Sequence, residues 1–272
     1  MLLVLAALVG SAVGSFLGLA AYRLPRMLEH RWQSECARLE GGEPPISAPL
    51  NLWRPASHCP ACGHRLGVAE NIPLLSWLLQ RGRCRACGAR IGWREPLLEL
   101  AAATAAMLAM TLFGPTWQAL LVAVFLWTLL LASAIDIERQ WLPDELTLPL
   151  LWLGLLFNLS GGLVSLSDAV IGAAAGYLTL WSVYWAFRLA TGREGMGEGD
   201  FKLLAAIGAW AGWQTLPGVV LLSSVAGSLW ALTAIWLFGR SRKTPLPFGP
   251  ALALGGAVAV CCPHLLADLF AP

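Results

Sequence analysis

The chain has 272 residues, of which 57% are hydrophobic and only 12% are charged, whereas roughly a quarter of the residues are charged in an ordinary soluble domain. This composition excludes a conventional water-soluble enzyme and indicates that lipid is the main solvent of the chain. The formal net charge is only +2, which excludes the strong positive field of a general nucleic-acid-binding protein.

Eight apolar segments have lengths near the ~20 residues that cross a bilayer. In chain order they are 1–22, 96–113, 116–135, 146–163, 168–187, 201–215, 217–238 and 249–268. The first has no basic residue before its apolar run and has Arg23 and Arg26 after it, an order that favours a retained anchor over a cleavable signal. The sixth is short and contains Gly208 and Gly212, so we expect it to be tilted or to pack against other helices.

All 18 lysines and arginines fall on one side of these segments. Eleven arginines lie within 23–94, and the others follow the third, fifth and seventh segments: Arg139, Arg188, Arg193, Lys202, Arg240, Arg242 and Lys243. Basic loops stay in the cytosol, so the amino terminus is expected outside the cytosol and the long segment inside it. The sequence therefore predicts an all-α polytopic membrane protein with about eight transmembrane helices: a first helix at 1–22, a cytosolic module at 23–95 and a membrane domain at 96–272.

Four of the seven cysteines have the spacing of a metal site within the cytosolic module. They form two Cys-x-x-Cys pairs, Cys59 with Cys62 and Cys84 with Cys87, and each pair is followed by a glycine, as tight metal-binding knuckles require. The sequence predicts a zinc ion that is held by four thiolates. Such a site has no open coordination position, so the zinc is expected to be structural. Two disulfides are disfavoured in the reducing cytosol, and another thiol chemistry or idle cysteines stay open as alternatives.

Two aspartates lie at the cytosolic face of the membrane domain. Asp136 ends the third segment, and Asp200 ends a Gly-Glu-Gly-Asp run just before the sixth. Two carboxylates held close together share one proton, which is what aspartic proteolysis requires. Gly197 and Gly199 would let a substrate backbone approach. On spacing alone, the sequence favours Asp200 as a simple N-cap of a helix that begins at Phe201.

Two other acidic residues have less specific interpretations. Asp144 follows Pro143 and is interpreted as a cap or turn residue of the fourth segment. Glu99 lies inside the second segment, where a carboxylate is costly, so we expect it to pair with an arginine or to face a cavity.

These motifs together resemble the type IV prepilin leader peptidases, and the resemblance covers nearly the whole chain. The matching elements are Gly14-Ser15-Phe16-Leu17, Tyr22-Arg23-Leu24-Pro25, the paired cysteines around Glu70-Asn71-Ile72-Pro73-Leu74-Leu75-Ser76-Trp77, Arg94-Glu95-Pro96-Leu97-Leu98-Glu99, Asp136 with Leu142-Pro143-Asp144, Gly197-Glu198-Gly199-Asp200 and Pro247-Phe248-Gly249-Pro250.

The resemblance implies a bifunctional enzyme of the bacterial inner membrane, with its amino terminus in the periplasm. Its substrates would be type IV prepilins or type II secretion pseudopilins, cleaved after a glycine on the cytosolic side by Asp136 and Asp200. The new amino terminus would then be methylated with S-adenosylmethionine. The module at 23–95 is similar to the methylation-associated domain of the family, so Glu70 and Asn71 are candidates for cofactor binding. No glycine-rich nucleotide turn is present, and no methyl-transfer base can be named.

Two functions of other classes remain as alternatives. A proton-coupled transporter would need carboxylates near the middle of the bilayer, whereas the informative ones cluster at one face. A non-enzymatic membrane scaffold would use the zinc module to dock cytosolic partners. Retained peptidase activity distinguishes the predicted enzyme from both.

Overall fold

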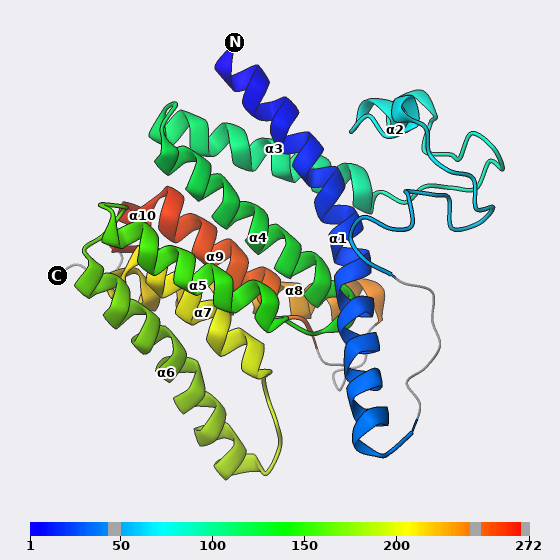
Figure 1. Cartoon of the computed structure of the whole chain (residues 1–272). Helices are drawn as coiled ribbons and strands as arrows, with labels where there is room; N and C mark the ends of the chain where they lie inside the picture. The colour runs from blue at the N-terminus through cyan, green and yellow to red at the C-terminus, as the bar shows by residue number, and fades with distance from the viewer. Residues whose placement is uncertain (43–49, 240–245, 268–272) are drawn as a thin grey trace. The chain divides into compact units, whose positions relative to one another are not determined.

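A computed structural model describes residues 1–42, 50–239 and 246–267, and over these residues the protein is mostly helical (Figure 1). Residues 43–49, 240–245 and 268–272 lie outside the described part, and with them Arg240, Arg242 and Lys243 of the predicted topology. The chain divides into two compact units, Met1–Thr111 and Leu112–Pro272.

The first unit is built on two long helices, α1 (Leu2–Leu39) and α3 (Arg94–Phe113). Helix α1 continues through Pro25 to Leu39, well past the predicted end of the first span at residue 22. The helices pack closely because glycines of α1 meet the backbone of α3: a Cβ on Gly14 would lie 2.5 Å from the Cα atom of Glu99. This contact fixes the backbone of Glu99 against α1.

Between α1 and α3 lies a small module with two short helices, η1 (Val68–Glu70) and α2 (Leu75–Leu79). Each cysteine pair forms a tight knuckle flanked by one isolated antiparallel bridge. The N–H of Gly63 donates to the carbonyl of Cys59 at 2.9 Å, and the N–H of Gly88 donates to that of Cys84 at 2.8 Å. Both glycines have φ of +71°, a conformation that glycine adopts without strain.

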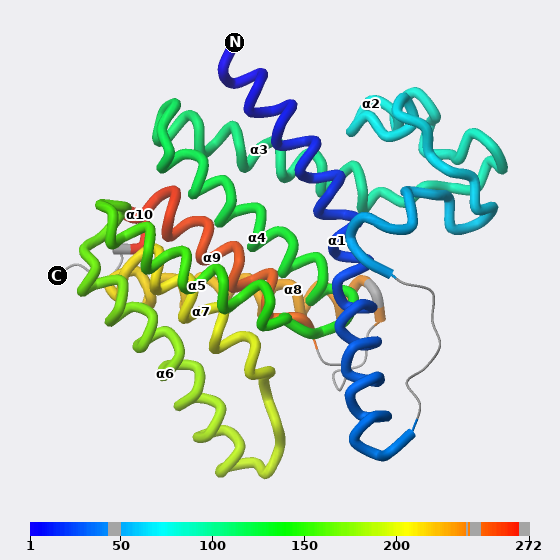
Figure 2. The backbone as a smooth tube through the Cα atoms, viewed as in Figure 1, coloured from blue at the N-terminus to red at the C-terminus, as the bar shows by residue number. Residues whose placement is uncertain are grey.

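The second unit contains six longer helices and two short ones. They are α4 (Trp117–Arg139), α5 (Asp144–Leu159), α6 (Leu166–Thr191), α7 (Glu198–Ala211), η2 (Trp213–Thr215), α8 (Leu216–Phe238), α9 (Gly249–Cys261) and α10 (Pro263–Ala267). Helix α7 packs against α5, α6 and α9, as the tube in Figure 2 shows. From Asp200 onward every residue of α7 except Lys202 is buried, so α7 forms the core of this unit.

The far end of α7 is fixed by buried hydrogen bonds. The indole of Trp210 lies against Gly154 and donates to the carbonyl of Leu150 at 2.9 Å. The side-chain amide of Asn158, on α5, donates to the carbonyl of Ala209 at 2.8 Å. Buried polar groups that are satisfied in this way specify one register, so α7 is held in a defined position along α5.

The fold confirms an all-α chain with apolar helices and a four-cysteine module. Within the described residues, five helical segments are long and apolar enough to cross a membrane: Leu2–Leu39, Arg94–Phe113, Trp117–Arg139, Leu166–Thr191 and Trp213–Leu237. Helices α5, α7 and α9 coincide with the other three predicted segments but are shorter. The last segment, predicted at 249–268, is interrupted at Cys262, between α9 and α10.

Candidate active site

Asp136 lies in the last turn of α4 and is only 5% exposed. Its Oδ2 atom accepts a hydrogen bond of 2.8 Å from the backbone N–H of Gly249, the first residue of α9. A Cβ atom on Gly249 would lie 2.7 Å from the same oxygen, closer than real Cβ contacts allow. The absence of a side chain at Gly249 therefore lets the backbone reach and orient the Asp136 carboxylate.

Asp200 is the third residue of α7 and is 8% exposed. The interpretation of Asp200 as an N-cap is wrong, because Gly197 is the N-cap and the N–H of Asp200 already donates to the carbonyl of Gly197 at 3.2 Å. Gly199 packs on Leu142: a Cβ there would lie 2.6 Å from the Leu142 Cβ. The small size of Gly199 therefore serves internal packing, whereas Gly197 has only the Asp200 carboxylate, at 4.0 Å, near its Cβ direction.

The two aspartates interact electrostatically. Burial of the Asp200 side chain, and then the charge of Asp136, raises the pKa of Asp200 to about 7. Asp200 lies ahead of the predicted segment 201–215 and outside the five candidate spans. When two carboxyl groups interact in this way, the charge of one disfavours ionisation of the other, and the two titrate as a coupled pair.

A third acidic residue, Asp144, ties the loop after α4 to α7. The Lys202 Nζ atom donates to both carboxylate oxygens of Asp144, at 2.7 and 2.8 Å. Asp144 is the first residue of α5, and Pro143 is its N-cap, so Asp144 acts as an ion-pair partner rather than as a cap. Sequence reasoning missed this pair because the two residues are 58 positions apart and follow no helical spacing.

The four predicted cysteines of the first unit come together. Their Sγ atoms all lie within 4.8 Å of one another, with Cys59 and Cys87 at 3.9 Å and Cys62 and Cys84 at 4.0 Å. A tetrahedral zinc ion with Zn–S bonds of ~2.3 Å places its sulfurs about 3.8 Å apart, so the donor set and its spacing fit zinc. The ordered knuckle turns supply the geometry that such a closed structural site needs.

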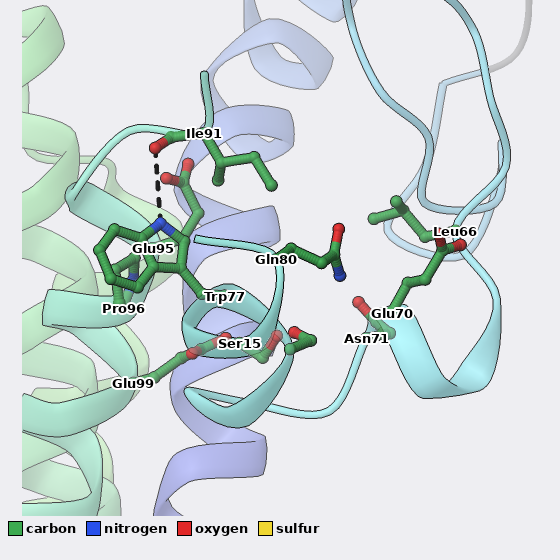
Figure 3. Close-up of a pocket in the computed structure, with 11 residues that line it drawn as sticks. Ser15, Leu66, Glu70, Asn71, Trp77, Gln80, Ile91, Glu95, Pro96 and Glu99 are labelled. Atoms are coloured by element: carbon green, nitrogen blue, oxygen red, sulfur yellow. Dashed lines mark hydrogen bonds between the residues drawn. The ribbon is translucent and has the colours of Figure 1, made fainter. Parts of the chain in front are cut away.

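Glu70 and Asn71 line a cavity of about 120 Å³ in the first unit, between the module, α1 and α3 (Figure 3). Glu70 Oε2 accepts a hydrogen bond of 2.9 Å from the N–H of Gly67 and lies 3.1 Å from His64 Nε2. The Gly67 N–H, and then His64, hold the pKa of Glu70 below its usual value. The module itself therefore keeps Glu70 ionised at the edge of the cavity.

Glu99 lines the same cavity, which confirms the second of the two alternatives predicted for it. It is 7% exposed, and its Oε2 accepts a hydrogen bond of 2.7 Å from the N–H of Leu74. Leu74 has φ of +59°, a left-handed conformation that costs energy for a residue with a side chain. Sequence reasoning did not connect Glu99 to Leu74, since only the fold brings them together.

Comparison with known proteins adds two family matches. A model described as "Type IV leader peptidase family" matches residues 123–232, and one described as "Bacterial Peptidase A24 N-terminal domain" matches residues 8–113. The first match contains Asp136 and Asp200, and the second contains the four cysteines and the cavity. No solved structure matches the chain significantly.

Several curated relatives are similar over most of their length, and each is named prepilin leader peptidase/N-methyltransferase. The relative from Aeromonas hydrophila is 53% identical over 253 residues, which cover 91% of this chain and 86% of the relative. That from Stutzerimonas stutzeri is 51% identical and covers 94% and 90%, and that from Pseudomonas aeruginosa is 50% identical and covers 93% and 88%.

Proposed function

The chain belongs to the type IV leader peptidase family, and we propose that it cuts the basic leader from prepilins or type II secretion pseudopilins with Asp136 and Asp200. Cleavage takes place after a glycine, and the new amino terminus is then N-methylated with S-adenosylmethionine as methyl donor. The observation that carries the proposal is the buried carboxyl pair. The Gly249 N–H orients the Asp136 carboxylate, and the charge of Asp136 contributes, after burial, to the raised pKa of Asp200.

The roles of the two carboxyls follow from their surroundings. We assign Asp136, whose carboxylate is oriented by the Gly249 N–H, as the member that removes a proton from water. Asp200 carries the shared proton and donates it toward the scissile carbonyl oxygen. As the leaving amine departs, Asp136 gives a proton to the amine nitrogen, and Asp200 takes back a proton from the former carbonyl oxygen. A helical substrate hides its carbonyls, so the leader junction must be extended where it meets the pair.

The helix ends around the pair support a topology of eight spans. Asp136 ends α4, whereas Asp144 begins α5, Asp200 lies in the first turn of α7 and Gly249 begins α9. A hydrogen bond joins Asp136 to Gly249, and an ion pair joins Asp144 to Lys202 of α7, which supports one common face for the ends of these four helices. We propose that successive helices alternate in direction, as the basic residues predict, with the active face in the cytosol and the amino terminus in the periplasm of an inner-membrane protein.

We assign the module at 23–95 to the methylation step and the four thiolates to a structural zinc ion. Zinc would supply folding energy to the module, because a closed four-thiolate site offers no open position for chemistry. Glu70 and Asn71 line the cavity, but 120 Å³ is below the ~300–1,000 Å³ of pockets that enclose small-molecule ligands. These residues therefore do not enclose a whole S-adenosylmethionine molecule.

The test is cleavage of a detergent-solubilised prepilin, with loss of the leader followed by mass. Asp136→Asn and Asp200→Asn are expected to fold and to lose cleavage. The matched control is Asp168→Asn, since this aspartate binds Ser165, Trp213 and Gln214 around the start of α6 and lies outside the pair. A wild-type protein that is folded and zinc-loaded but cuts nothing would favour the scaffold or the transporter.

A further inference from the structure

The cavity beside α3 has the chemical character of a cation site. Three carboxylates line it, those of Glu70, Glu95 and Glu99. None of the lining residues is lysine, arginine or histidine, although His64 lies 3.1 Å from the Glu70 carboxylate outside the lining. In Figure 3, Glu95 and Glu99 come from α3, and Ser15 comes from α1. Carboxylates that line one small cavity attract positive charge and repel anions.

Glu99 is the buried member of this set. It is 7% exposed and belongs to a helix that is a candidate membrane span, where a carboxylate is costly unless it is used. The N–H of Leu74 holds one of its oxygens, so the orientation of the carboxylate is fixed from the module side. The positive φ of Leu74 is the conformational cost of presenting that N–H.

The Trp77 side chain and the volume of the cavity indicate which kind of cation could bind there. The Trp77 indole is fixed by a hydrogen bond of 3.4 Å to the carbonyl of Ile91 and by packing against Trp93, with ring centroids 4.3 Å apart. Tryptophan is the aromatic side chain that best attracts an ammonium group. A cavity of about 120 Å³ is smaller than the ~300–1,000 Å³ of pockets that enclose small-molecule ligands, so it suits an ammonium group and its first carbon atoms rather than a nucleoside.

We propose that this cavity binds the free α-ammonium group of the processed substrate and that Glu99 takes its proton. This step rests on the proposed methyl transfer, because a sulfonium donor supplies an electrophilic methyl group and requires a nitrogen with a free lone pair. One N–H proton passes to a Glu99 carboxylate oxygen, and the N–H bonding pair stays on the nitrogen as the lone pair of a neutral amine. Glu95 is exposed and offers a route for the proton to water.

Binding is tested in the full-length, zinc-loaded protein without a methyl donor. The probes are a synthetic peptide with the amino terminus of a mature pilin and the same peptide with that terminus acetylated. Wild type is expected to bind the free amine at least about tenfold more tightly, and Glu99→Gln is expected to lose this preference. Glutamine keeps an oxygen acceptor for the Leu74 N–H, and Glu40→Gln, an exposed residue that follows α1, is the matched control.

Activity gives a second readout. Methylation of the processed peptide by Glu99→Gln is expected to fall by about a hundredfold or more, the usual contribution of a general base. Leader cleavage and zinc content report on folding. The proposal would be overturned if Glu99→Gln methylated at the wild-type rate or kept its preference for the free amine. It would also be overturned if Glu99→Gln lost zinc or cleavage, because Glu99 would then be a structural support of Leu74. If wild type binds the free amine but methylates nothing, the methyl-transfer function fails while the binding site stands.

Discussion

Replacement of Gly249 by alanine tests whether the backbone of α9 orients the catalytic pair. The new Cβ would begin 2.7 Å from Asp136 Oδ2, and ordinary contact begins near 3.4 Å, so the carboxylate must move by about 0.7 Å. The hydrogen bond from the residue 249 N–H, now 2.8 Å, would lengthen beyond bonding range. A hydrogen bond to a charged group contributes about 1.5–3 kcal/mol, which corresponds to about a ten- to hundredfold loss of rate.

The assay is the steady-state cleavage of a prepilin, in which kcat is expected to fall with little change in KM, because the substitution acts on the orientation of the Asp136 carboxylate. Gly227→Ala is the matched control: its Cβ would meet Phe248 at 3.4 Å, which is ordinary contact, so it should cut at the wild-type rate. Tm values separate a displaced carboxylate from an unfolded bundle. Wild-type kcat in Gly249→Ala would refute the orienting role of this residue.

Three further outcomes are expected. Cleavage should decline as the pH rises above the Asp200 pKa of about 7, because the pair then loses the proton that it shares; a rate that stays constant from pH 6 to 9 would contradict this sign. Serine at any one of the four clustered cysteines should release zinc, measured by metal analysis, and should abolish methylation. A double-mutant cycle with Lys202→Met and Asp144→Asn should give a coupling free energy of about 1 kcal/mol in thermal unfolding, whereas the exposed 3.9 Å pair of Arg188 and Glu194 should give none. If the two pairs gave the same coupling free energy, the short contact between Lys202 and Asp144 would stabilise the protein no more than an ordinary exposed ion pair.

The helices could be predicted from the sequence because apolar length is a local property. The predicted segments fall on helices, although the last is divided between α9 and α10, and helix α1 runs on to Leu39, past the predicted end of the first span at residue 22. Basic residues stop a membrane span without stopping a helix, and α1 continues as a charged helix. Arg23 is then buried and donates to the carbonyls of Asn51 and Pro55, a contact across about thirty positions that no periodicity indicates.

The reactive side chains could be proposed from residue type and spacing, whereas the groups that orient them could not. Cysteine pairs and a Gly-x-Gly-Asp run are local signals, and the structure brings the four cysteines together and places the two aspartates within electrostatic reach. The Gly249 N–H that holds Asp136 comes from 113 positions away, and a backbone donor leaves no trace in residue type. The glycine is visible in the sequence, but its function as a close approach to a carboxylate depends on the packing of α9 against α4.

The carboxylates of this protein divide by the kind of donor that holds them. Asp144 forms an ion pair with Lys202, which stabilises the charged form of the carboxylate and links α5 to α7. Asp136 and Glu99 each receive a backbone N–H, which fixes the orientation of the carboxylate without the full charge of an adjacent cation. A group that must accept and release a proton in each turnover needs orientation without a strong preference for one charge state. Glu70 also receives a backbone N–H, from Gly67, but it has His64 beside it in addition, and both lower its pKa. Orientation by a backbone N–H without a neighbouring cation is compatible with proton transfer at Asp136 and at Glu99, and a lysine placed beside either carboxylate should slow the reaction that depends on it.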